Sequence, residues 1–185
     1  MTNQAEFWQS MPMPAPVELV HSHTHSLRTV SGDEALVVRV LTRDGAIGVG
    51  FTLNLDAAVA RDMAAWDAAA RRAGSPLWKL LGGKARAAIP VLRASGEGLD
   101  PWSAGSVEAV LAARPRLLVA PHAHAWEIAW CATLAASLGG GTAIAVPGEP
   151  RLARAQPPDA PGHGIDWSSE PLFAAIRWSD PARAS

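Results

Sequence analysis

Cysteine is nearly absent from this chain of 185 residues, with Cys131 as the only one. A single thiol cannot form an intramolecular disulfide, and its position in an apolar run predicts a small buried side chain. The N-terminal segment also lacks a basic stretch followed by a long apolar one, which argues against a secretory signal. These absences favour a reducing compartment, and we expect a cytoplasmic protein.

Long apolar runs and an excess of charge of one sign are missing as well. Although 49% of the residues are hydrophobic, no run reaches the ~18 apolar residues that a membrane-spanning helix needs. Lysine and arginine number 16 against 17 aspartate and glutamate residues, a formal net charge of −1. Because binding to nucleic acid or to an anionic membrane usually leaves a basic footprint, we expect neither partner.

The first third of the chain contains a strand pattern followed by a helix pattern. Asp44 and Gly45 separate two apolar runs, and this dipeptide favours a hairpin turn because glycine adopts positive φ without steric cost. With the alternating segment before them, these runs predict an antiparallel meander with strands over residues 17–30, 35–41 and 47–51. Asp56 is then a candidate N-cap of a helix, and Gly74 is its expected stop.

The rest of the chain alternates short apolar strands with helices. The stretches "AAIPVLRAS", "RLLVAP" and "TAIAV" predict strands, whereas "SVEAVLAA" and "HAWEIAWCATLAASLGGG" predict helices, the second with a triple-glycine stop. Proline and glycine after the last strand predict an irregular tail. The chain of 185 residues is too short for a complete (β/α)8 barrel, which takes about 250 residues.

Several stretches carry a family resemblance. "ARDMAAWDAAARRAGSPLWKLLGGKARAAIPV" resembles the junction between cap domain and barrel in the mandelate racemase and muconate lactonizing branch of the enolase superfamily. "VVRVLTRDGAIGVGF" is similar to the family's cap hairpin, and "SVEAVLAARPRLLVAPHAHAWEIAWCATLAASL" is similar to its seventh barrel strand with the flanking helices. "APGHGIDWSSEPL" resembles the closing segment of the family.

The resemblance implies an internally truncated form of the family fold. Cap-domain helices have no counterpart between Asn54 and Leu55, nor have the second to sixth barrel strands between Ser95 and Ser106. We therefore predict an α+β fold, with a reduced antiparallel three-stranded cap meander and a helix, plus a fragment of a (β/α)8 barrel whose strands resemble the first, seventh and eighth. The expected parts are an N-terminal arm, a reduced cap domain, a partial barrel and a C-terminal tail returning toward the cap, at residues 1–16, 17–87, 88–150 and 151–185.

The resemblance also implies a chemistry. The family's reaction is Mg²⁺-dependent removal of the proton α to a carboxylate, and an active member would be an isomerase, a racemase or an acid-sugar dehydratase, which is a lyase. The family takes its Mg²⁺ ligands from the third to fifth strands and its base from a Lys-x-Lys motif on the second. This chain has no counterpart of those strands, and its two lysines, Lys79 and Lys84, precede the first barrel strand. We therefore expect the lone chain to lack the activity.

Two residues match family site positions. His122 ends "RLLVAPH" and aligns with the seventh-strand histidine that is the second base of racemising members. Its usual orienting aspartate belongs to the absent sixth strand, so we expect its imidazole to lack the partner that sets the tautomer. Glu149 follows the last strand and matches an eighth-strand glutamate that hydrogen-bonds substrate.

Alternating histidines form a separate candidate site. His21, His23 and His25 lie at every second position, so a strand would project all three from one face, where imidazoles could bind Zn²⁺. We favour a solvent-facing stripe with adventitious zinc affinity, because no second ligand motif accompanies it. His122 and His124 show the same spacing at a strand end, where parallel α/β folds place their sites.

Exposed strand edges bear on partners and function. A sheet cut from a closed barrel leaves unpaired edges and apolar surface, so we expect a homo-oligomer. One rival hypothesis is a binding or regulatory pseudoenzyme that acts through oligomerisation, with a full-length relative as a further partner. Another is a repurposed enzyme with a histidine-based metal site across a subunit interface. A small carboxylate or an acid sugar is the expected ligand of an active form, and a remnant without function stays open.

Overall fold

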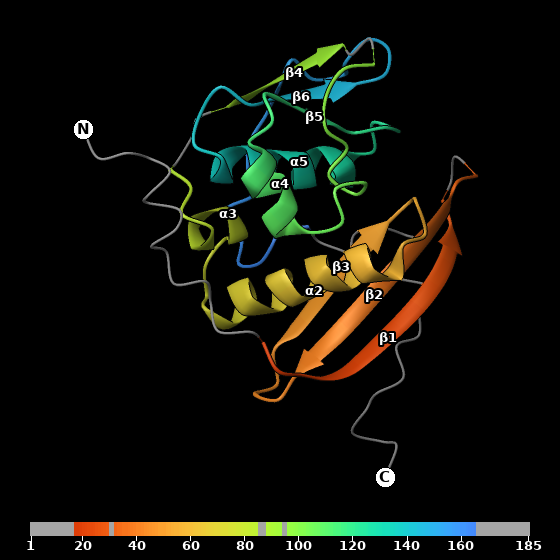
Figure 1. Ribbon diagram of the computed structural model, residues 1–185, viewed down its shortest axis with the longest axis vertical. Coiled ribbons are helices and arrows are strands. Elements are labelled where there is room, and N and C mark those ends of the chain that lie inside the picture. Colours follow the sequence, from red (N-terminus) through yellow and green to blue (C-terminus); the bar gives the residue numbers. More distant parts are fainter. Residues whose placement is uncertain (1–16, 30–31, 85–87, 94–95, 166–185) are drawn as a thin grey trace.

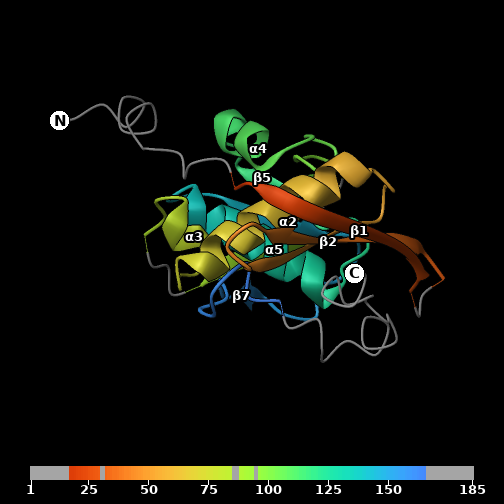
Figure 2. The same cartoon turned by 90° about the horizontal axis from the view of Figure 1, so that it is seen from below.

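The computed structural model describes residues 17–29, 32–84, 88–93 and 96–165. The predicted N-terminal arm and the end of the predicted tail lie outside the described residues. Two sheets form opposite ends of the molecule, and helices lie between them (Figure 1). In the view from below, helix α4 and strand β7 lie on opposite sides of helix α5 (Figure 2). The mixed α+β class predicted from the sequence is confirmed.

The first sheet is the predicted meander. Its strands are β1 (Leu19–Arg28), β2 (Glu34–Thr42) and β3 (Ile47–Thr52), paired antiparallel in the order β1-β2-β3. The turn between β2 and β3 contains Gly45 at a φ of +87°, which is the positive value that the Asp-Gly pattern predicts. The Ala46 amide also donates to Oγ1 of the strand-ending threonine at 2.8 Å.

Helix α2 (Ala57–Arg72) packs closely on one face of this sheet. Two glycines of β3 make the approach feasible, because a Cβ at Gly48 would lie 2.0 Å from the Ala64 carbonyl oxygen. A Cβ at Gly50 would lie 1.9 Å from the Ala60 carbonyl oxygen. A side chain at either position would force α2 away from the sheet, so the two glycines determine the distance between helix and sheet.

Both ends of α2 follow the predicted signals. The Asp56 side chain accepts hydrogen bonds from the amides of Ala58 and Val59, which confirms it as the N-cap. Gly74 follows the C-cap residue Ala73 at a φ of +61°, and it ends the helix as expected.

The second sheet contains three parallel strands and one short antiparallel strand. Strands β4 (Ile89–Arg93), β5 (Leu117–Val119) and β6 (Ala143–Val146) are parallel in the order β5-β6-β4. Strand β7 (Arg154–Ala155) pairs antiparallel with β4. The sequence predicted an irregular segment there, and two residues of pairing leave no periodicity by which to recognise a strand.

Both outer edges of the parallel strands are partly covered, which corrects the expectation of two open edges. On the β5 side, Leu99 forms a parallel bridge: its amide donates to the Leu117 carbonyl and its carbonyl accepts from the Val119 amide, each at 2.9 Å. On the β4 side, the Val91 amide donates to the Ala153 carbonyl at 3.0 Å. Segments of the chain itself therefore satisfy part of each edge.

Three further helices complete the core. They are α3 (Leu77–Leu80), α4 (Val107–Ala113) and α5 (Ala125–Ser137), and α5 contacts β4, β5, β6 and β7. Four tryptophans anchor this core and are all buried: Trp66, Trp78, Trp126 and Trp130. Cys131 is buried as well, as predicted.

One hydrophobic cluster includes side chains from both sheets, among them Phe51 of β3 and Ile144 of β6.

The division into cap, barrel fragment and tail remains a prediction. Within the part of the chain that the structure describes, no helix is long and apolar enough to cross a membrane.

Candidate functional site at the strand ends

The carboxyl ends of the parallel strands meet at one edge of the second sheet. Arg93 is the last residue of β4, His122 follows β5, and Glu149 follows β6. Parallel strands in α/β folds gather their functional side chains at this edge, because successive loops converge there. Polar side chains in these loops therefore lie close enough to act together.

His122 forms a pair with Glu127 of the first turn of α5. Its Nδ1 lies 3.1 Å from Glu127 Oε1, and the carboxylate side chain is 2% exposed while the imidazole is 39% exposed. Because a carboxylate only accepts hydrogen bonds, Nδ1 is the donor of this pair, and in the neutral imidazole Nε2 then carries the lone pair. A base in this tautomer presents Nε2 for proton transfer.

The expectation that His122 lacks an orienting partner is therefore wrong. Glu127 takes that role from the helix that follows the strand, rather than from a neighbouring strand. The same carboxylate accepts the amides of His122 and His124 through Oε2 at 3.1 and 3.0 Å, as the third residue of a capping box does. The spacing His124-x-x-Glu127 at the start of a predicted helix is the sequence signal that could have identified Glu127 as a capping residue.

His124 lies beside this pair and connects it to the first sheet. Its ring stacks on Trp126 with centroids 5.0 Å apart and on His122 with centroids 6.0 Å apart. Its Nε2 is buried, has no hydrogen-bond partner among the described residues, and lies 3.6 Å from Asp33 Oδ2. Asp33, which precedes β2, thus lies close to the residues that follow β5.

Glu149 lies at the same edge but has a different partner. Its Oε1 is 3.3 Å from Nη1 of Arg93, and the two side chains are 84% and 67% exposed. This is a solvated ion pair between the ends of β6 and β4. The structure therefore brings His122, His124 and Glu127 together and places Glu149 with Arg93 instead.

The groups at this edge do not fit the Mg²⁺ ion of the resembling family. Mg²⁺ takes an octahedral set of hard oxygen ligands. Both oxygens of Glu127 are occupied by nitrogen donors, and Glu149 is paired with a guanidinium group. Throughout the described ranges, no group of three or more His, Cys, Asp or Glu side chains is placed to hold a metal ion.

The histidine stripe on β1 has the predicted alternation. His21, His23 and His25 pair with successive odd positions of β2 and so share one face of the sheet. The rings of His21 and His23 are stacked with centroids 6.4 Å apart. None of the three belongs to a metal-holding group within the described residues, and their zinc affinity stays a prediction.

A second histidine–carboxylate pair was missed by the sequence analysis. His163 and Asp67 are both 0% exposed, and the His163 amide donates to Asp67 Oδ1 at 2.8 Å. Asp67 Oδ2 accepts from the Val49 amide at 3.0 Å and from Nε of Arg71 at 2.8 Å. His163 Nε2 donates to the Val49 carbonyl at 2.7 Å, and its Nδ1 accepts the Ile165 amide at 3.2 Å.

This buried cluster joins three distant segments and has no atom left for a ligand. Burial lowers the pKa of His163, with the Asp67 carboxylate opposing the shift, so the ring is neutral at pH 7. The bonds tie β3, α2 and the segment around residue 163 to one another. No sequence periodicity predicts the contact between His163 and Asp67, because the two residues are 96 positions apart in the chain.

Comparison with protein families identifies one matching segment. Residues 50–82 match the model described as "Mandelate racemase / muconate lactonizing enzyme, N-terminal domain". The match covers the end of β3, all of α2 and all of α3. It confirms the resemblance predicted from the sequence: this chain is similar to the mandelate racemase and muconate lactonizing enzymes. A comparison with curated proteins finds no match.

Solved structures of the same family resemble the chain more loosely. A mandelate racemase/muconate lactonizing enzyme from Bordetella bronchiseptica RB50 is 22% identical, with a TM-score of 0.38, over 71% of this chain and 51% of that one. A racemase from Streptomyces coelicolor A3(2) with bound magnesium is 20% identical, with a TM-score of 0.36, over 69% and 54%. A dipeptide epimerase from Methylococcus capsulatus complexed with Mg ion is 18% identical, with a TM-score of 0.35, over 70% and 52%. The chain thus spans about half the length of the structures that it matches.

Proposed function

We propose that this chain is an internally truncated protein of the mandelate racemase and muconate lactonizing type that acts as a binding or regulatory pseudoenzyme. It does not by itself remove the proton α to a carboxylate with the help of Mg²⁺. One observation carries the proposal: the carboxylates at the strand ends are already occupied, Glu127 by nitrogen donors and Glu149 by Arg93.

The strand order supports the barrel part of this proposal. We assign β4, β5 and β6 as counterparts of the first, seventh and eighth barrel strands. In a closed barrel the eighth strand lies between the seventh and the first. The parallel strands here follow that order, β5-β6-β4.

The absence of a suitable lysine supports the loss of the family reaction. Proton abstraction needs a base near neutral pKa beside the substrate carbon, and the family's base is a lysine. Lys79 lies in α3 and Lys84 follows it, both before β4. Neither belongs to the loops after the parallel strands, where His122 and Glu149 lie.

Calorimetric titration of the metal-free protein with Mg²⁺ tests this proposal. We expect no saturable binding in a sample that unfolds cooperatively, and no Mg²⁺-dependent deuterium exchange at the α-carbon of a panel of acid sugars and small carboxylates. The Glu149→Gln variant shows whether any Mg²⁺ binding occurs at the strand ends, since it removes the exposed carboxylate of this edge. One-site Mg²⁺ binding that Glu149→Gln abolishes, together with exchange that requires the metal, would overturn the proposal.

The His122–Glu127 pair favours a second candidate function, which is proton transfer without a metal. A carboxylate 3.1 Å from Nδ1 sets the tautomer of a half-exposed imidazole, and this is the geometry of an oriented general base. Exchange at an α-carbon in the presence of a chelator, lost in His122→Gln, would establish this function. Retention of that exchange in His122→Gln would refute it.

Oligomerisation is the remaining part of the proposal. Leu92 on β4 and Leu152 beside β7 are 48% and 62% exposed, and their burial would stabilise an assembly. We propose a homo-oligomer in the cytoplasm, with a full-length relative as a further partner and a small carboxylate or acid sugar as the ligand. Light scattering coupled to size exclusion measures the assembly, and a monodisperse monomer at all concentrations would contradict it. Co-purification with a full-length relative would establish the second partner.

A further inference from the structure

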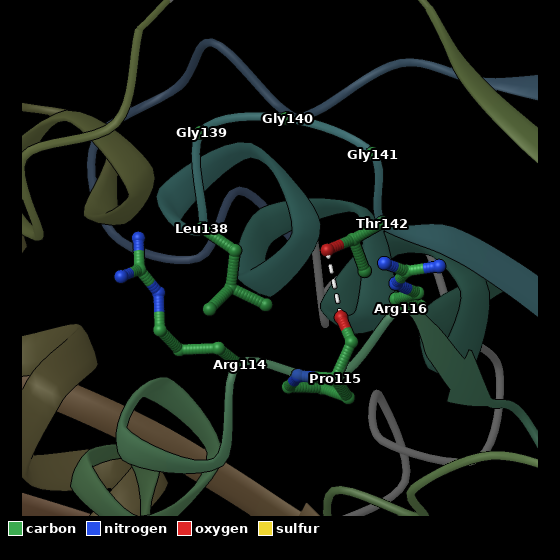
Figure 3. A pocket seen from close by; sticks show the side chains of 8 residues that line it. All are labelled: Arg114, Pro115, Arg116, Leu138, Gly139, Gly140, Gly141 and Thr142. Atoms are coloured by element: carbon green, nitrogen blue, oxygen red, sulfur yellow. Dashed lines mark hydrogen bonds between the residues drawn. The ribbon is translucent and has the colours of Figure 1, made fainter. Parts of the chain in front are cut away.

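A pocket of about 580 Å³ lies at the opposite edge of the second sheet, away from His122. Its walls come from the residues before β5 and the residues before β6, which are the amino ends of these parallel strands. Figure 3 shows Arg114 and Arg116 on opposite sides of the pocket, with the glycine loop of residues 139–141 along its upper rim.

The formal charges on the side chains that line this pocket are all positive. Both arginine side chains are exposed, and neither forms an ion pair or a hydrogen bond within the described residues. No aspartate or glutamate lines the walls. Two guanidinium groups without counter-charges therefore face one cavity in a protein whose net charge is −1, which is a local field that favours an anion.

The glycine loop adds free backbone donors. Gly139, Gly140 and Gly141 have φ values of +80°, +153° and +78°, so the loop depends on glycine conformations. Their amides form no hydrogen bond within the described part of the chain, whereas the neighbouring Leu138 amide donates to Leu134. Such unpaired, exposed backbone amides are hydrogen-bond donors that a bound anion can use.

The walls of the pocket are held in place. Thr142 Oγ1 donates to the Pro115 carbonyl at 2.9 Å, which ties the glycine loop to the arginine segment (Figure 3). The Ala143 amide donates to the Arg116 carbonyl, also at 2.9 Å. Arg114 has left-handed backbone angles, φ 47° and ψ 53°, a conformation that usually selects glycine or asparagine. These hydrogen bonds tie the two segments to each other.

We propose that this pocket binds a small organic phosphate. Guanidinium groups match the geometry of phosphate oxygens, and the free glycine amides supply additional donors. A volume of about 580 Å³ falls within the ~300–1,000 Å³ of small-molecule sites, so the ligand is larger than a bare phosphate ion. This site is independent of the function proposed for the opposite edge, because it shares none of the residues discussed there.

Calorimetry with ribose 5-phosphate, inorganic phosphate and ribose tests the proposal on the full chain. We expect saturable one-site binding of ribose 5-phosphate, weaker binding of inorganic phosphate and no binding of ribose. Added NaCl should weaken both interactions, because salt screens exposed charges. Equal binding of ribose and ribose 5-phosphate, or no binding of either phosphate to the folded protein, would overturn the proposal.

Charge removal locates the binding. Arg116→Gln should weaken ribose 5-phosphate binding roughly tenfold, the effect of losing one charge-assisted hydrogen bond. Arg61→Gln is the matched control, because it removes an equal charge from the exposed surface of α2. The same loss in both variants would show a general charge effect and refute the site.

A second pair of variants keeps the loop conformation and changes only the charge. Asparagine and aspartate both tolerate positive φ, and a Cβ at Gly141 would meet no atom within 4 Å. Gly141→Asp should abolish binding, whereas Gly141→Asn should retain it, with equal thermal unfolding midpoints for the two variants. Equal affinities of these variants would exclude the glycine loop from the site.

Discussion

The protein contains two histidine–carboxylate pairs, one beside each sheet, and the same residue types do different things in the two places. Next to the first sheet, His163 and Asp67 are both 0% exposed, and neighbouring groups bond both ring nitrogens and both carboxylate oxygens. Next to the second sheet, Glu127 is buried but the His122 ring is 39% exposed. The first pair joins segments of the chain, whereas the second orients one nitrogen toward its surroundings.

The number of free atoms explains the difference. Every polar atom of the first pair already has a protein partner, so the pair cannot take up a ligand without breaking a bond. His122 Nε2 forms no hydrogen bond with the described residues, and its lone pair remains available. A histidine beside a carboxylate is therefore a candidate base only when one ring nitrogen is unpaired and accessible.

Removing the carboxylate of the first pair should have the largest effect. Asp67→Ala leaves the amides of Val49 and His163 without an acceptor in a fully buried place. We expect a loss of about 3–5 kcal/mol in the free energy of unfolding, the usual cost of breaking a buried charged network. Urea denaturation measures it, with the exposed Asp159→Ala as the control. A loss no larger than that of the control would mean that the cluster does not stabilise the fold.

The pH dependence of stability should also come from the first pair. Burial lowers the pKa of His163 below its ordinary value of 6.5. At a pH below 6.5, the unfolded chain binds a proton at His163 that the folded protein does not bind. The stabilising contribution of neutral His163 is therefore fully present above pH 6.5 and is lost as the pH falls through the lower pKa of the folded state. Urea midpoints between about pH 5 and about pH 8 test this. The slope should be flatter in His163→Gln, and an unchanged slope would assign the effect to other groups.

Removing the carboxylate of the second pair should cost less. Glu127→Ala deletes the capping interactions at the start of α5. The amides that it frees belong to His122 and His124, whose side chains are 39% and 22% exposed, so water can replace the acceptor. We expect a loss of about 1–2 kcal/mol in the free energy of unfolding. Glu127→Gln retains an acceptor oxygen and should lose less. A loss as large as that of Asp67→Ala would show that both pairs are structural, and the comparison would fail.

The exposed ion pair at the strand ends should contribute least. Arg93 and Glu149 are 67% and 84% exposed, so salt and water screen their attraction. We expect Glu149→Gln to change the free energy of unfolding by less than about 0.5 kcal/mol, at low and at high salt. A larger, salt-sensitive change would indicate that Glu149 takes part in a more extended charge network.

The elements with local signals were predictable. Asp44 and Gly45 mark the hairpin turn and Asp56 marks the start of α2, because turn and cap preferences arise within a few residues. The triple glycine marks the end of α5 in the same way. The capping role of Glu127 also had a local signal, the His124-x-x-Glu127 spacing, whereas the family resemblance pointed to a partner for His122 on a separate strand.

The elements that depend on distant partners were not predictable. Strand β7 consists of two residues and exists because β4 offers it an edge. Leu99 satisfies the other edge through a single bridge to β5. Neither segment has an alternating pattern, since one or two paired residues are too few to show a period of two.

Residue order alone was enough to establish the meander, the helix ends, the family resemblance and the position of His122 at a strand end, because these follow from preferences acting over a few neighbouring residues. The folded arrangement decided which polar groups became enclosed and which stayed accessible. Asp67 is sealed by His163, 96 residues away, whereas Glu127 orients His122 from five residues away and leaves its ring half in solvent. Burial is a property of packing between distant segments, so only the tertiary structure could separate the structural pair from the candidate base.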